Sequence, residues 1–90
     1  MKEFKELLEQ MQDTYEKKNA DYGDSFSQSI SKWGYTAALV RMDDKMNRLN
    51  SLLCRKTAQQ VKDESAFDTA MDLANYAAML AMEIKNRSNG

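Results

Sequence analysis

The chain has 90 residues, with 13 Lys and Arg against 14 Asp and Glu, and a formal net charge of −1. This balance gives no global field for a nucleic-acid polymer or an anionic membrane, and no apolar run could span a bilayer. The sequence has one cysteine, Cys54, so an intrachain disulfide is excluded. It has no histidine, which excludes the usual general base and nearly all zinc sites. Any catalysis would have to use carboxylates with a hard cation such as Mg²⁺. We expect one cytoplasmic domain over residues 1–90.

Helix-period patterns dominate a sequence that lacks proline. The first helix is predicted from Lys2 to about Asn19, and the second from residue 35 or 36 to residue 55. The third begins near Asp63, a good N-cap, and residues 86–90 are predicted to be a frayed tail. The apolar positions that set these periods are Phe4, Leu7, Leu8, Met11 and Tyr15, then Leu39, Met42, Met46, Leu49 and Leu53, then Phe67, Met71, Ala74, Ala78 and Ala81.

Residues 18–26, K-N-A-D-Y-G-D-S-F, separate the first two segments and concentrate polar side chains around Gly23, which tolerates a positive φ. This composition predicts an ordered loop that presents polar groups. The alternative is a helix C-cap and a tight turn with both aromatic residues packed on the core. Residues 27–34 extend this non-periodic region, and Ile30 and Trp33 indicate that it packs down, with room for a short helical turn.

The third helix is apolar on two sides and rich in alanine, at positions 66, 70, 74, 77, 78 and 81. One chain with three long helices cannot easily cover both sides. The pattern favours a helical dimer or higher oligomer, and the alternative is a monomeric three-helix bundle.

A stripe of acidic and amide residues lies along the same helix, at Glu64, Asp68, Asp72 and Asn75. Like charges four residues apart repel, so a cation or basic groups from another helix must compensate them. The second helix offers Arg41, Lys45 and Arg48 on one side. Two interpretations remain open: a salt-bridge network between the helices, or a polar pocket covered by residues 18–26.

Several segments together resemble the first nucleotide modification associated domain family of bacteria and phages. These are K-N-A-D-Y-G-D-S-F, then W-G, then A-L-V-R-M-D-D-K-M-N-R-L, then V-K-D-E-S-A-F-D-T-A-M-D-L-A-N-Y-A. The family looks related to the MazG-like all-α nucleotide pyrophosphohydrolases, in which carboxylate pairs on two helices hold Mg²⁺. The resemblance implies an all-α, MazG-like bundle of three main helices, completed by oligomerisation. Here Asp44 replaces two expected glutamates, and Asp68 and Asp72 are four residues apart instead of three, so nucleotide binding carries over better than hydrolysis.

The resemblance implies a nucleotide-binding protein, and one possible role is to sequester a phosphorylated or cyclic nucleotide signal in a bacterial or phage-infected cell. Arg41, Lys45 and Arg48 would hold phosphates, and Tyr22 or Trp33 would stack on a base. The full set of expected ligand-binding residues is Lys18, Asn19, Asp21, Tyr22, Gly23, Asp24, Ser25, Phe26, Trp33, Arg41, Lys45, Arg48, Asp68, Asp72 and Asn75. One alternative is a Mg²⁺-dependent pyrophosphohydrolase using Asp44, Glu64, Asp68 and Asp72. Another is a structural helical adaptor without a ligand.

Overall fold

The computed structural model describes residues 2–22, 24–54 and 63–88, without the side chains of 20–22 and 63–65. The described residues form four helices and no strand: α1 (Lys2–Tyr22), α2 (Ser25–Trp33), α3 (Thr36–Cys54) and α4 (Asp63–Ser88). This confirms the all-α expectation and the approximate bounds of the three long helices. None of the described helices is long and apolar enough to cross a membrane.

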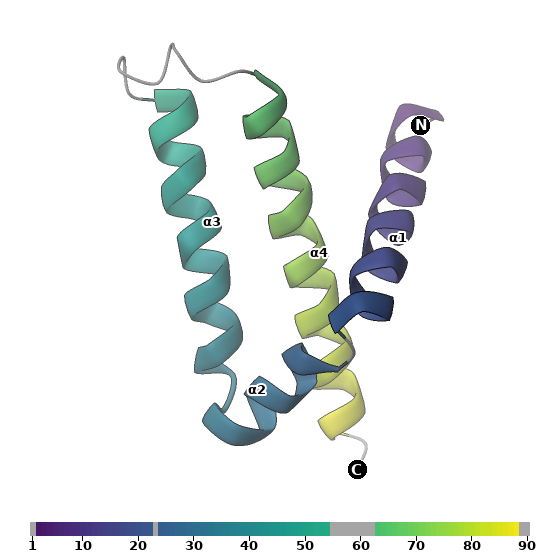
Figure 1. The fold of residues 1–90 in the computed structure, drawn as a ribbon, viewed down its shortest axis with the longest axis vertical. Helices are drawn as coiled ribbons and strands as arrows, with labels where there is room; N and C mark the ends of the chain where they lie inside the picture. The colour runs from purple at the N-terminus through teal and green to yellow at the C-terminus, as the bar shows by residue number, and fades with distance from the viewer. Residues whose placement is uncertain (1, 23, 55–62, 89–90) are drawn as a thin grey trace.

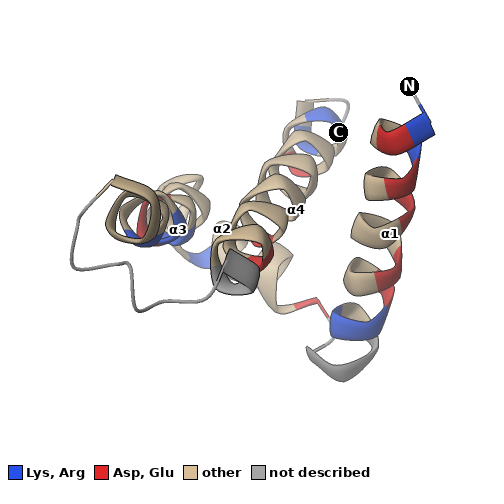
Figure 2. Ribbon diagram, turned by 90° about the horizontal axis from the view of Figure 1, so that it is seen from above, with Lys and Arg blue, Asp and Glu red and all other residues tan. Residues whose placement is uncertain are grey.

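The helix α4 is central, with α3 antiparallel to it on one side and α1 on the other (Figure 1). The short helix α2 crosses the base of the layer. Helix α1 diverges from α4 toward its N-terminus, so the layer opens at that end (Figure 1). The acidic residues of α1 lie mainly on the side that faces away from α4 (Figure 2).

The expected loop over residues 18–26 is wrong. Residues 18–22 form the last turn of α1, and Ser25 and Phe26 begin α2. No proline or glycine occurs before residue 23, so nothing in the sequence stops α1 at Asn19. The short helical turn allowed within residues 27–34 is part of a longer helix over residues 25–33, in which Ile30 packs down as expected and Trp33 does not. The tail prediction fails for residues 86–88, which continue α4.

Helix α2 is short but fixed at both ends. The backbone N–H of Gln28 donates to the carbonyl of Asp24 at 3.0 Å, and the N–H of Gly34 donates to the carbonyl of Ile30 at 2.7 Å. Gly34 has φ +79° and ψ −176°, a region that is essentially restricted to glycine. The chain therefore turns from α2 into α3 at a position where a side chain would be strained.

The core is thin and lies where α2, α3 and α4 meet. Among the described residues, the buried apolar side chains are Phe26, Ile30 and Ala38, and residues of α4 such as Tyr76 and Leu80 pack against them. The two buried residues of α2 are four positions apart, so they lie on one face of the helix. The core thus holds α2 against the α3–α4 pair.

Candidate functional site

A pocket of about 140 Å³ lies between α1, the start of α2, α3 and α4. Its lining residues are Tyr15, Lys18, Asn19, Asp24, Ser25, Phe26, Ser27, Arg41, Asp72, Asn75, Tyr76, Met79, Met82 and Glu83. Eight of these were expected as ligand residues from the sequence: Lys18, Asn19, Asp24, Ser25, Phe26, Arg41, Asp72 and Asn75. The fold therefore brings more than half of the predicted set to one place.

Asp72 joins three helices at the edge of this pocket. One carboxylate oxygen accepts from Lys18 Nζ of α1 at 3.2 Å, and the other lies 3.4 Å from Lys45 Nζ of α3. This confirms that basic groups from other helices compensate the acidic stripe of α4 at Asp72. The three residues keep a net charge of +1, and each ammonium has three N–H donors, so donors remain for a second anion.

An aromatic and cationic group forms another wall of the pocket. The Phe26 ring stacks on the Tyr76 ring, with centroids 5.9 Å apart. The Arg41 guanidinium carbon lies 5.6 Å from the Phe26 centroid, and Arg41 Nη2 donates to Ser29 Oγ at 3.0 Å. Arg41 is thus held by a neutral partner and a ring, so its positive charge is not neutralised by a carboxylate among the described residues.

Asn75 fixes α1 against α4 beside the lysine pair. Its Nδ2 donates to the backbone carbonyl of Met11 at 3.2 Å. This bond uses the amide nitrogen of Asn75, and the described residues provide no hydrogen-bond donor to its amide oxygen, which has two lone pairs.

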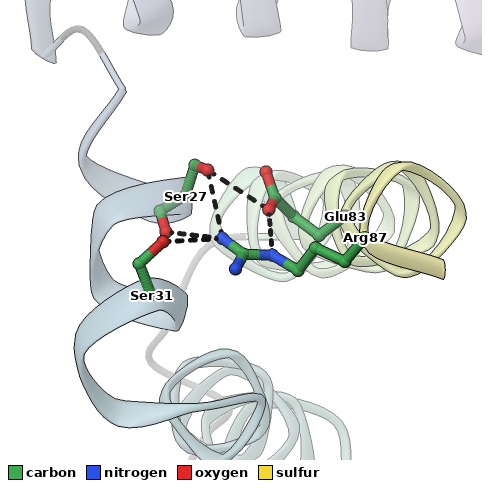
Figure 3. A network of polar contacts seen from close by, with 4 residues as sticks. All are labelled: Ser27, Ser31, Glu83 and Arg87. Carbon is green, nitrogen blue, oxygen red and sulfur yellow. Dashed lines mark hydrogen bonds and ion pairs between the residues drawn. The ribbon is translucent and has the colours of Figure 1, made fainter. Parts of the chain in front are cut away.

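Ser27, Ser31, Glu83 and Arg87 form a four-residue clasp (Figure 3), and two of them, Ser27 and Glu83, line the pocket. Arg87 donates through Nε to Glu83 Oε1 at 2.8 Å, and through Nη2 to the Ser27 carbonyl and the Ser31 hydroxyl, both at 3.0 Å. The Ser27 hydroxyl donates to the same Glu83 oxygen at 3.2 Å. The clasp binds the C-terminal end of α4 to α2 and fixes two residues of the pocket wall, Ser27 and Glu83.

Other expected ligand residues lie elsewhere. Trp33 is 72% exposed at the end of α2 and does not line the pocket. Arg48 donates through Nε to Thr69 Oγ1 at 3.2 Å, between α3 and α4. Asp68 lines a separate, more open groove between α1 and α4. Lys45 reaches the pocket only through Asp72. The salt-bridge network expected between Arg41, Lys45 and Arg48 of α3 and Asp68 and Asp72 of α4 is present among the described residues only as the single pair of Lys45 and Asp72.

Four expected residues lie outside the described part: Gly23 entirely, and the side chains of Asp21, Tyr22 and Glu64. Of the proposed metal ligands, Asp44 is exposed on α3. Within the described residues, no three carboxylate or thiol groups gather as a metal site would require.

The sequence interpretation missed Tyr15, Ser27, Tyr76, Met79, Met82 and Glu83 as pocket residues. A signal for three of them was present. Tyr76, Met79 and Glu83 continue the stripe from Asp72 at steps of 4, 3 and 4, so they share one face of α4.

The model of the nucleotide modification associated domain 1 family matches residues 18–84. The chain belongs to this family. The match starts at Lys18, the residue of α1 that pairs with Asp72, and it ends one residue after Glu83. Searches of curated proteins and of solved structures gave no match. The family domain therefore spans nearly all of the pocket, with Tyr15 as the one lining residue before it.

Proposed function

We propose that this member of the nucleotide modification associated domain 1 family binds a nucleotide in the pocket between α1 and α4. The main support for the proposal is that one pocket brings together an aromatic wall, formed by Phe26 and Tyr76, and positively charged groups of Arg41 and Lys18 with N–H donors that are not all used. A cavity of about 150 Å³ accommodates a single aromatic ring. The volume of about 140 Å³ therefore suits the ring of a base, with room for phosphates only toward the pocket mouth.

Two groups would hold the phosphates. Arg41 would supply a planar guanidinium with a neutral hydrogen-bond partner, and guanidinium groups bind phosphate oxygens in a bidentate manner. Lys18 and Lys45 would supply further charge through the donors that Asp72 leaves free. Tyr76, which is half-buried against Phe26, would offer a ring face to the base.

The proposal includes a MazG-like bundle that self-associates in the cytoplasm of a bacterial or phage-infected cell. A role in sequestering a phosphorylated or cyclic nucleotide is the simplest outcome of binding without turnover. Hydrolysis by a Mg²⁺ site would need carboxylates from outside the described residues, such as Glu64, beside Asp68 and Asp72.

Mass spectrometry of small molecules released from heat-denatured protein tests the proposal. The wild type should release a nucleotide in near-stoichiometric amount, and protein with Arg41→Ala should release much less. Addition of nucleoside triphosphates with Mg²⁺ separates the alternatives, because monophosphate and pyrophosphate would form only in a hydrolase. Neither bound nucleotide nor turnover would favour a structural adaptor.

A further inference from the structure

Glu83 is the pocket carboxylate that the clasp holds, and its two oxygens are used unequally. Oε1 accepts from Arg87 Nε at 2.8 Å and from the Ser27 hydroxyl at 3.2 Å. The other oxygen, Oε2, receives no hydrogen bond from the described residues and lies on the side turned away from Arg87 (Figure 3). The clasp therefore fixes the carboxylate through one oxygen and leaves the other without a donor.

Oε2 of Glu83 is accessible although most of the side chain is buried. The side chain is 19% exposed and lines the pocket. Within the described part of the chain, every fully buried side-chain oxygen or nitrogen has a hydrogen-bond partner. Since Oε2 has none, it is not fully buried. A ligand in the pocket can therefore reach an acceptor that water solvates only in part, where a hydrogen bond is stronger than on an open surface.

The acceptor positions that remain on Glu83 indicate the chemistry of the ligand. A carboxylate has about four lone-pair positions. Arg87 and Ser27 use two of them, both on Oε1, so about two remain on Oε2. A group that matches this oxygen brings two hydrogen-bond donors close together and presents no lone pair to the carboxylate.

Glu83 and Asp72 mark two ends of one face of α4. Eleven residues separate them, which is about three turns and about 16 Å along the helix axis. Tyr76 lies between them on the same face and lines the pocket. Two lysines give positive charge in excess at Asp72, whereas Arg87 balances the charge of Glu83. A nucleotide therefore fits with its phosphates toward Asp72 and its base toward Glu83.

The pairing edge of guanine has the required donors, because its N1–H and N2–H₂ groups lie on adjacent atoms. Adenine and cytosine place a ring nitrogen with a lone pair beside the amino group. Uracil and thymine place a carbonyl oxygen on each side of N3–H. The edge of guanine belongs to its six-membered ring, so the cavity of about 140 Å³ holds this ring, with the five-membered ring and the sugar toward the mouth.

We propose that the pocket selects guanine nucleotides, with Glu83 Oε2 accepting hydrogen bonds from N1 and N2 of the base. This inference rests on the proposed binding of a nucleotide, and it adds the base and the residue that selects it. Asp24 also lines the pocket, but it is exposed and its side chain does not cap α2. Glu83 is the pocket carboxylate that the clasp orients in advance.

Calorimetric titration of the wild-type chain with GTP, ITP and ATP in EDTA tests the selection without any substitution. GTP should bind roughly 100-fold more tightly than ATP, which lacks both donors of the guanine edge. ITP keeps N1–H but lacks the N2 amino group. It should bind about 10-fold more weakly than GTP, as expected for the loss of one hydrogen bond to a charged acceptor.

Glu83→Gln identifies the residue that selects the base. Glutamine keeps the size of the side chain and an oxygen for the clasp, but it removes the charge and puts N–H donors against those of the base. The variant should keep its helical circular dichroism, bind GTP about 10-fold or more weakly, and lose most of the difference between GTP and ITP. Asp24→Asn is the matched control, and it should retain the preference for GTP.

Three results would overturn guanine selection and leave nucleotide binding standing. These are equal affinities for the three nucleotides, tighter binding of ATP than of GTP, and a preference for GTP that persists in Glu83→Gln. Loss of that preference in Asp24→Asn alone would overturn the role of Glu83. Absence of binding by every nucleoside triphosphate would instead overturn the proposed function, and this inference with it.

Discussion

The rings of Phe26 and Tyr76 lie almost parallel, with their planes at 24° and their centroids 5.9 Å apart. This contact joins α2 to α4 at a point that is both core and pocket wall. Phe26 is 7% exposed, so its ring belongs mainly to the core, and Tyr76 presents the accessible part of the pair. The alternative interpretation of residues 18–26, in which both aromatic residues pack on the core, is therefore correct for Phe26, whereas the side chain of Tyr22 lies outside the described part.

Removal of the Tyr76 ring should weaken the fold. Tyr76→Ala should lower the free energy of unfolding by about 2–4 kcal/mol, through lost burial and the lost ring contact. Tyr76→Phe keeps the ring and should change it by less than about 1 kcal/mol. Urea denaturation followed by circular dichroism checks both variants. Equal losses would show that the hydroxyl, and not the ring, makes the contribution.

Arg41 and Arg48 lie on the same side of α3, but substitution of Arg41 should mainly weaken nucleotide binding, whereas substitution of Arg48 should mainly lower stability. Arg41 lines the pocket, and its loss should weaken binding of a phosphorylated nucleotide by roughly 30-fold or more, as for a lost anion contact of about 2–5 kcal/mol. Arg48 donates to Thr69, which is buried, so Arg48→Ala should lower stability by about 1–3 kcal/mol with little change in affinity. Calorimetric titration and thermal denaturation of both variants separate these effects. Similar nucleotide affinities in the two variants would show that Arg41 does not bind the phosphates.

The three long helices were predictable because their apolar residues repeat over about three or four turns. Helix α2 was not assigned, because its periodic apolar residues, Phe26, Ile30 and Trp33, span only eight positions. Gly23 and the polar residues around it suggested a loop, although α1 continues to Tyr22 and α2 begins at Ser25.

The site was partly predictable for a related reason. Lys18, Arg41 and Asp72 could be assigned from their chemistry, and the antiparallel packing brings them together. The clasp of Ser27 and Arg87 could not, since the two residues are 60 positions apart and lie on helices whose relative placement the sequence does not reveal. Trp33 illustrates the reverse error, because an aromatic residue near the loop need not face the pocket.

The clasp should depend on the planar guanidinium of Arg87. Arg87→Lys retains the charge but cannot donate to Glu83, Ser27 and Ser31 at once. We expect a loss of about 1–2 kcal/mol in the free energy of unfolding. Lys85→Ala is the control, because Lys85 is exposed and forms no ion pair with the described residues. Denaturant titration measures both, and an unaffected Arg87→Lys variant would show that charge alone suffices.

Gly34 should tolerate no side chain despite open space around it. A Cβ at this position would meet no atom within 4 Å, so any penalty comes from the backbone, at φ +79°. Gly34→Ala should therefore lower the free energy of unfolding by about 1–3 kcal/mol. Gln28→Ala, at an exposed position within α2, should be close to neutral. A neutral Gly34→Ala would mean that the turn between α2 and α3 relaxes without loss.

Calorimetric titration of the wild-type chain with each of the four nucleoside triphosphates, in EDTA, tests the central claim most directly. Phosphate binding by Arg41 and the lysine pair needs no metal, so at least one nucleotide should bind with micromolar or better affinity, and Arg41→Ala should abolish most of that heat. Absence of binding in EDTA, with binding restored by Mg²⁺ and unaffected by Arg41→Ala, would contradict the account and favour a metal-dependent pyrophosphohydrolase.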